Sequence, residues 1–167
     1  MGRIEALKAM LGEGRVGFLI DEVMDGSHHF VVDRDRAGEQ PFVFRVTWGA
    51  KHLGKFVNPM EPEFLTAFLF GTVTIGGLCQ DAPCEGSLEL LYFSGAKIRY
   101  TFDFEVDGTR YRYVGEKRDI RPWNLHRTHT TCYGTVTDLQ TGEVISESIT
   151  HFRLSAAPSF VATFRLA

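Results

Sequence analysis

The sequence has few cysteines and no long hydrophobic run, and each absence excludes a class of protein. Its three cysteines in 167 residues are odd in number and too few for a disulfide framework. We expect reduced thiols in a cytoplasmic protein, with a bridge between Cys79 and Cys84 as the alternative. No apolar stretch has the length of a membrane span, and charges interrupt the first residues where a signal peptide needs an apolar run.

The sequence has no large excess of either charge and no known catalytic motif. The formal net charge is -3 with both signs interspersed, so we expect no nucleic-acid partner and no attraction to an anionic membrane. The motifs G-x-S-x-G and H-E-x-x-H, the phosphate loop and the dinucleotide fingerprint are absent from the sequence. We therefore expect no cofactor.

One segment has the residue types of a metal site. His126, His129 and Cys132 are spaced as H-x-x-H-x-x-C. Residues three apart on a strand point to opposite faces, and no second cluster supplies the remaining ligands. We expect the two histidines to lie at a rim or a surface, with no metal.

What is present indicates one β-rich domain over residues 1–167. Aromatic residues make up 13% of the chain, and about nine segments of aromatic and β-branched residues are separated by Gly, Pro, Asp and Asn. Ile4, Leu7 and Leu11 are at helical spacing, so we expect an N-terminal helix and cap over residues 1–14. Residues 15–167 then form the β-structure, and 51–63 is a loop with room for one helical turn.

The clearest local signal is a hairpin whose two-residue turn is Asp107 and Gly108. Its register follows from the turn and brings opposite charges together on one face and aromatic rings on the other. The predicted pairs are Val106 with Thr109, Phe104 with Tyr111, Phe102 with Tyr113, Glu105 with Arg110, Asp103 with Arg112, and Arg99 with Glu116. We expect the aromatic face to be the inner one.

A second hairpin is expected around Gly142, with Leu139 opposite Glu143. Its charged face should be outer, and its inner face should carry only small or slender side chains: Cys132, Gly134, Val136, Ser146, Ser148 and Thr150. This wall has too little volume to fill a barrel at normal density, so we expect an empty space opposite the aromatic hairpin. Ser148→Phe should then fill that space at little cost in stability.

An antiparallel meander of this many strands closes into a barrel or folds into a sandwich, and we expect the barrel. A barrel of about eight strands can hold one small ligand. The expected ligand-lining residues are Tyr100, Phe102, Phe104, Tyr111 and Tyr113 on the aromatic side, Cys132, Ser148 and Thr150 on the small side, and Trp123 at the rim.

The order of several motifs resembles a known domain. They are FLIDEVMDG, PFVFRVTW, HLGKFVNP, GTVTIGG, CEGSLELLYF, the hairpin KIRYTFDFEVDGTRYRYVGEK and the run from Trp123 to HTT, between Phe18 and Val136. Together they resemble the C-terminal β-rich domain of bacterial glucose-methanol-choline-type, cholesterol-oxidase-like oxidoreductases. The resemblance implies a lipocalin-like barrel, contact with sterol-like or other apolar molecules, and association with an oxidoreductase. It carries over no catalytic residue, because the flavin-binding part is not in these 167 residues.

The function expected from the sequence is binding of a small apolar or amphipathic molecule, without catalysis, in the barrel interior. The alternative is an isomerase, cyclase or hydrolase that uses His129 or His151 with Glu147 as acid and base in the same interior. A third interpretation is a filled barrel that forms a homodimer through Ile145 and Ile149.

Overall fold

A computed structural model describes residues 17–32, 38–120, 131–152 and 165–166. The helix expected over residues 1–14, and Trp123, His126 and His129, lie outside these residues. The described elements are β1 (Phe18–Phe30), β2 (Gln40–Ala50), α2 (Leu53–Phe56), β3 (Thr66–Ile75), β4 (Cys79–Leu91), β5 (Lys97–Val106), β6 (Thr109–Lys117), β7 (Thr131–Asp138), β8 (Val144–Phe152) and β9 (Arg165–Leu166).

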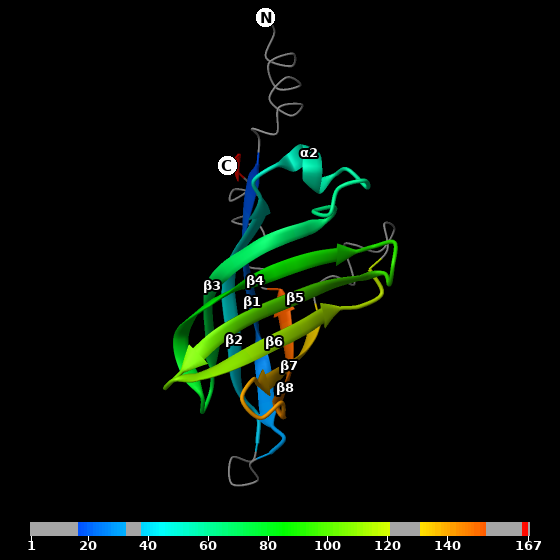
Figure 1. Cartoon of the computed structure of the whole chain (residues 1–167). Coiled ribbons are helices and arrows are strands. Elements are labelled where there is room, and N and C mark those ends of the chain that lie inside the picture. Colours follow the sequence, from blue (N-terminus) through cyan, green and yellow to red (C-terminus); the bar gives the residue numbers. More distant parts are fainter. Residues whose placement is uncertain (1–16, 33–37, 121–130, 153–164, 167) are drawn as a thin grey trace, which may run out of the picture.

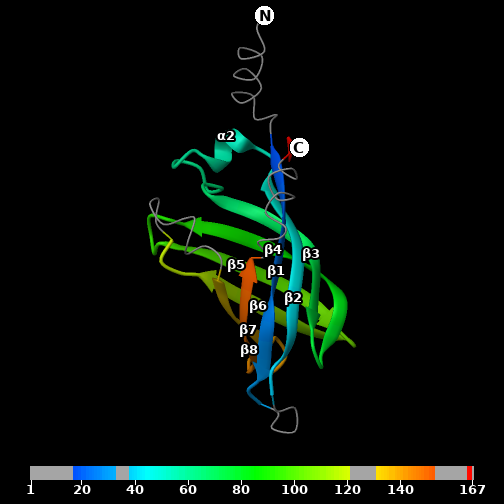
Figure 2. The ribbon, with the colours of Figure 1, turned by 180° about the vertical axis from the view of Figure 1, so that it is seen from behind.

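The strands form a closed antiparallel β-barrel, which confirms the predicted fold and excludes the sandwich. Strands β2 to β8 follow one another in the sheet, and β1 closes the barrel because it pairs with both β8 and β2. β9 pairs with the first residues of β1, Phe18 and Leu19. Opposite views show β1, β2 and β8 running steeply across β4, β5 and β6 (Figures 1 and 2).

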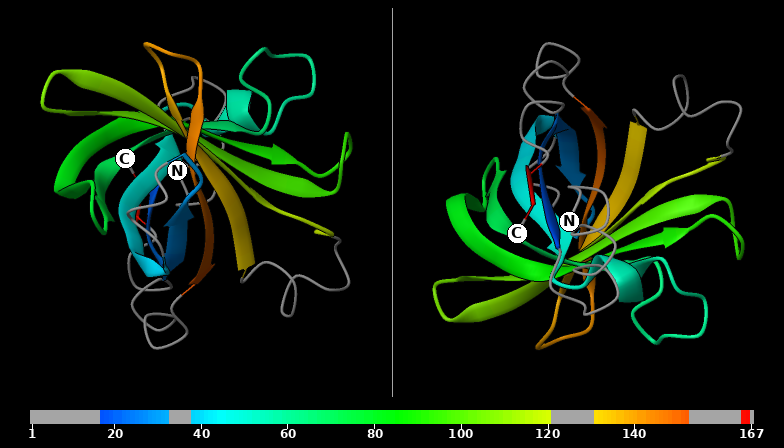
Figure 3. Two further views of the ribbon diagram at one scale, coloured as in Figure 1. Left: turned by 90° about the horizontal axis from the view of Figure 1, so that it is seen from below. Right: turned by 90° about the horizontal axis from the view of Figure 1, so that it is seen from above.

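One end of the barrel, here named the α2 end, carries the helical turn α2 (Figure 3). This turn confirms the helical turn expected in the loop. The same end contains the start of β1, the ends of β2 and β6, and the loops 57–65 and 92–96. The two loops meet where Phe64 stacks on Phe93, with 6.4 Å between ring centroids.

The β5–β6 hairpin has the predicted register at all six expected pairs. Asp107 and Gly108 both have positive φ, as the expected turn requires. On the outer face, Arg112 forms an ion pair with Asp103 at 2.7 Å and Arg99 forms one with Glu116 at 3.6 Å. The aromatic residues alternate with these charges and face inward, so the turn and the charge pairs select the same register.

The β7–β8 hairpin has the predicted faces, but the pairing at its turn was predicted wrongly. Cys132 lies opposite Thr150 and Gly134 opposite Ser148, with all four residues buried. A bulge between Val136 and Thr137 shifts the register by one residue, so the strands close at Asp138 and Glu143 instead of Leu139 and Glu143. Because the bulge lies next to the turn, it leaves the inner wall of small residues unchanged.

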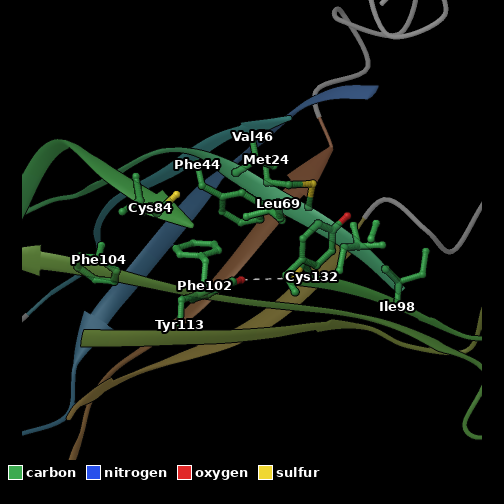
Figure 4. Packing of buried hydrophobic residues seen from close by; sticks show 14 of the residues in the cluster. Met24, Phe44, Val46, Leu69, Cys84, Ile98, Phe102, Phe104, Tyr113 and Cys132 are labelled. Carbon is green, nitrogen blue, oxygen red and sulfur yellow. Dashed lines mark hydrogen bonds between the residues drawn. The ribbon is translucent and has the colours of Figure 1, made fainter. Parts of the chain in front are cut away.

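The space expected beside this wall is occupied at its centre by the ring of Tyr113. A Cβ atom added to Gly115 or Gly134 would lie less than 3.0 Å from atoms of that ring, which is too close. The absence of a side chain at these two glycines therefore allows the ring to pack against the wall. The centroid of the same ring is 5.3 Å from that of Phe42 and 5.4 Å from that of Phe44, and both phenylalanines belong to β2, on the opposite side of the barrel. Figure 4 shows Phe44 and Tyr113 extending toward each other. The barrel centre is therefore packed with aromatic rings, and the expected empty space at that level is wrong.

His28, on β1, connects β8 with the turn between β3 and β4 at the end opposite α2. It is 1% exposed, and its Nε2 and Nδ1 atoms lie 2.8 Å from the Gly76 carbonyl oxygen and the Ser146 hydroxyl respectively. A carbonyl oxygen only accepts, so Nε2 carries the proton and Nδ1 accepts from Ser146. Burial is the main cause that lowers the pKa of His28 below 6.5, and the fold therefore holds this imidazole neutral.

The lowered pKa of buried His28 predicts that the stability of the fold depends on pH. The unfolded chain takes up a proton at His28 near pH 6.5, whereas the folded protein resists it, so the unfolding free energy should fall as the pH drops below that value. Urea unfolding between about pH 7 and about pH 5 measures this slope. His28→Gln, which keeps hydrogen-bonding atoms but cannot titrate, should flatten it. An unchanged slope in the variant would show that other groups cause it.

Candidate functional site

A buried carboxylate lies inside the barrel near the α2 end. Alternate residues of β1 face inward, and the inward set contains Glu22 between Ile20 and Met24. Glu22 is 6% exposed. Its carboxylate accepts from Lys117, from the Tyr100 hydroxyl at 2.9 Å and 3.0 Å, and from Trp48 Nε1 at 3.1 Å. A buried acidic group thus has three donors from three different strands.

The counter-ion is the last residue of β6. Lys117 follows Tyr113 and Gly115 on the inward face and is 3% exposed. Its Nζ lies 2.6 Å from Glu22 Oε1. The same Nζ lies 5.2 Å from the centroid of the Tyr100 ring and 5.9 Å from the centroid of the Phe152 ring. The ammonium has three N–H donors, and among the described residues only one oxygen atom accepts from it.

Tyr100 and Trp48 complete the cluster, which we name the Glu22 site: Glu22, Lys117, Tyr100 and Trp48. Burial, followed by the negative charge of Glu22, raises the pKa of Tyr100 well above its usual value, so the phenol stays a donor at neutral pH. Trp48 is half-buried and packs edge-on against Phe18 at 5.9 Å. Its indole is the member of the site nearest to solvent.

A second polar group lies further inside, between β6, β7 and β8. The Tyr113 hydroxyl and the Cys132 sulfur share a hydrogen bond at 3.4 Å (Figure 4). Burial raises the pKa of Cys132 to about 11, so the thiol is protonated and a poor nucleophile. Among the described residues, the buried hydroxyl oxygens of Ser148 and Thr150 have no hydrogen bond of good geometry, although both hydroxyls lie near that of Tyr113 and lower its pKa against the larger effect of burial. Buried polar atoms of this kind are usually satisfied by water or a ligand.

The structure brings together part of the predicted ligand lining. The buried members are Tyr100, Phe102, Phe104, Tyr113, Cys132, Ser148 and Thr150, whereas Tyr111 is partly exposed. Tyr100 and Tyr113 contact the polar groups, but Phe104 and Tyr111 stack on each other near the Asp107 turn, away from the α2 end. Trp123 lies outside the described residues, so its place at the rim stays a prediction.

The acid and base expected on β8 do not face the interior. Glu147 and His151 occupy outward positions, with Glu147 3.5 Å from His29 and His151 3.1 Å from the Thr131 hydroxyl. Strand alternation requires this, because the inward positions are Ser146, Ser148 and Thr150. The prediction that Glu147 and His151 act as acid and base inside the barrel is therefore wrong. His129 lies outside the described residues.

The outer surface carries an open groove of about 500 Å³ across β1, β6, β7 and β8. His29 and Glu147 line it and are both more than half exposed. Arg118 lies over the Tyr133 ring on the same side, at 5.3 Å. Solvated pairs of this kind contribute little to binding or stability, so the groove is a weaker candidate than the buried Glu22 site.

Sequence reasoning noticed Glu22 and Lys117 separately but did not pair them. Glu22 was part of the motif FLIDEVMDG, and Lys117 was the last residue of the hairpin motif KIRYTFDFEVDGTRYRYVGEK. The signal that identifies them is a charge at an inward position of a strand whose other inward residues are apolar or aromatic. Their contact spans 95 residues and depends on barrel closure, which no local pattern contains.

The cysteine and metal predictions have separate outcomes. Cys79, Cys84 and Cys132 are all free thiols, so the alternative bridge is not present. Within the described ranges, no three His, Cys, Asp or Glu side chains lie close enough together to hold a metal. Nor does any helix in that part of the chain have the length and apolar character needed to cross a membrane.

Comparison of the chain with protein-family models, with curated proteins and with solved structures gives no match in any of the three. The class defined by the fold and the site is therefore a closed antiparallel barrel with a buried ion pair near one end.

Proposed function

We propose that the barrel binds a small amphipathic molecule at the α2 end, with the polar part of that molecule directed toward the Glu22 site. The observation that carries the proposal is the buried ion pair between Lys117 and Glu22. An ion pair taken out of water is a poor source of stability, because desolvation offsets most of the attraction. Buried charged groups with specific partners are instead often part of functional sites, and in the same cluster burial, followed by the charge of Glu22, raises the pKa of Tyr100.

Apolar side chains at the α2 end support an amphipathic ligand. Phe93 is 87% exposed and Met60 is 89% exposed, and both belong to the two loops that meet at this end. Behind them the inner lining is apolar, with Phe18, Phe56 and Ile98 buried. A molecule bound here would contact apolar groups along its body and polar groups at one tip.

The resemblance to the oxidoreductase domain is compatible with this proposal. It adds sterol-like molecules as one class of apolar ligand, a lipocalin-like way of binding them, and an oxidoreductase as a partner. A homodimer is a separate proposal: Ile149 is exposed beside the exposed Tyr133, while Ile145 is half-buried. Size-exclusion chromatography with light scattering tests the dimer, and a monomeric mass would reject it.

Native mass spectrometry of freshly purified protein tests ligand binding. We expect a co-purified small molecule, or saturable 1:1 binding of the neutral dye Nile red with an emission shift to shorter wavelength. Nile red should also change the fluorescence of Trp48, and Trp48→Phe, which leaves Trp123 in place, assigns that change. Protein that is always ligand-free and that binds the dye only without saturation would reject the proposal.

A further inference from the structure

The hydrogen bonds of the Glu22 site are unevenly distributed between its two charges. The Glu22 carboxylate accepts from Lys117, Tyr100 and Trp48, so its oxygens are well satisfied. Within the described ranges, the Lys117 ammonium donates to a single oxygen atom. Its other neighbours are the rings of Tyr100 and Phe152, at distances that allow a cation–π attraction but no hydrogen bond. Within the part of the chain that the structure describes, the Lys117 ammonium therefore has spare donors, whereas the Glu22 carboxylate already accepts from three groups.

A second observation places further unused polar atoms nearby. Thr150 and Phe152 are successive inward residues of β8, and the Phe152 ring lies 5.9 Å from Lys117 Nζ. Thr150 is fully buried, and its hydroxyl, which lies near the Tyr113 hydroxyl and the Cys132 thiol, has no hydrogen bond of good geometry within the described residues. Its strand neighbour opposite is Cys132, which contributes a weakly polar thiol. Lys117 and Thr150 thus offer unsatisfied donors on one side of the interior.

Charge balance decides which polar group these donors can receive. Glu22 and Lys117 together are neutral, and both are desolvated. An anionic ligand would add a third charge to a buried site without a second counter-ion, which is costly. A ligand hydroxyl or neutral amine can accept from Lys117, but each also carries hydrogens that need acceptors, and the Glu22 carboxylate already accepts from three donors. A carbonyl oxygen accepts hydrogen bonds, carries no hydrogen and has no net charge.

We infer that the barrel selects neutral, carbonyl-bearing apolar molecules such as ketones, whose oxygen accepts a hydrogen bond from Lys117. This inference rests on the proposed function, because it specifies the polar tip of the ligand. Thr150 is a positioning residue that supplies a second donor to the same polar tip. A hydrogen bond from a charged donor is expected to favour a ketone over the matched hydrocarbon by about tenfold or more.

Three probes of one shape separate the possibilities: 2-acetylnaphthalene, 2-ethylnaphthalene and 2-naphthoate. Equilibrium dialysis with the full chain gives their dissociation constants. We expect the ketone to bind about tenfold or more tighter than the hydrocarbon, and tighter than the carboxylate. The π–π* absorption band of the aryl ketone should shift to longer wavelength on binding, because a cation that donates to the carbonyl oxygen stabilises the more polar excited state, and the hydrocarbon band should not.

Variants assign the preference to Lys117. The double variant Glu22→Gln with Lys117→Met removes both charges, which avoids leaving one of them buried alone. It should bind the ketone and the hydrocarbon equally and lose the spectral shift. Thr150→Val should weaken ketone binding only. Lys55→Met, which removes an exposed ammonium, should change neither affinity nor spectrum.

The outcomes distinguish this inference from the proposed function. Equal affinity for ketone and hydrocarbon in the unmodified protein would overturn the inference and leave barrel binding intact, with buried water as the partner of the donors. Tightest binding of the carboxylate would also overturn it, in favour of an anionic ligand. Failure of all three probes to bind up to their solubility limits would overturn the inference and the proposed function together.

Discussion

Lys117→Met is expected to lower the unfolding free energy by about 3–5 kcal/mol, because it leaves the Glu22 carboxylate buried without its counter-ion. Tyr100 and Trp48 would still donate to that carboxylate, but neither supplies a positive charge. Urea unfolding followed by circular dichroism measures the loss, provided that the slope with denaturant stays constant. Glu22→Gln should also destabilise the barrel, since it leaves the ammonium unpaired.

The double variant Glu22→Gln with Lys117→Met shows how much of the loss in unfolding free energy comes from leaving one charge buried without a partner, and how much comes from losing the ion pair itself. With both charges removed, stability should return to within about 1–2 kcal/mol of the original protein, because the pair itself contributes little net stability. Lys55→Met should have no measurable effect. A single variant that loses less than about 1 kcal/mol would mean that the two charges are solvated, and the site would lose its main support.

The β5–β6 hairpin shows how far local sequence determines this structure. Its turn residues, its charge pairs and its aromatic alternation all indicate one register, and the structure has that register. The inner wall of β7 and β8 was predicted correctly for the same reason, since period-two alternation is a local property. Closure into a barrel followed from the number of strands and from the cost of open edges.

The contents of the interior could not be predicted in the same way. The sequence placed large rings on one wall and small side chains on the other, and from their volumes an empty space was expected. That estimate left out the direction of one side chain. The Tyr113 ring lies along its own sheet over Gly115 and Gly134, and Phe42 and Phe44 arrive from β2. Such contacts depend on rotamers and on strands far apart in sequence.

Gly134→Ala is expected to destabilise the protein by about 1–3 kcal/mol, because the new methyl group would overlap the Tyr113 ring. In an open strand the same substitution would be neutral or favourable, since alanine loses less conformational freedom on folding than glycine. The sign of the effect therefore reports whether the ring occupies this position. Ser148→Phe should be destabilising as well, which reverses the result expected from an empty space.

Tyr113→Leu supplies the control for this prediction. A shorter side chain at that position leaves room above Gly134, so Gly134→Ala should cost less in the Tyr113→Leu background than in the original protein. A double-mutant cycle on urea unfolding measures the difference, which should exceed about 0.5 kcal/mol for two residues in contact. Gly95→Ala, in the loop 92–96 beside a flexible lysine side chain, should be close to neutral in both backgrounds. Additive effects of the two substitutions would show that the ring is elsewhere, and the interior would then have the free volume that the small-residue wall implies.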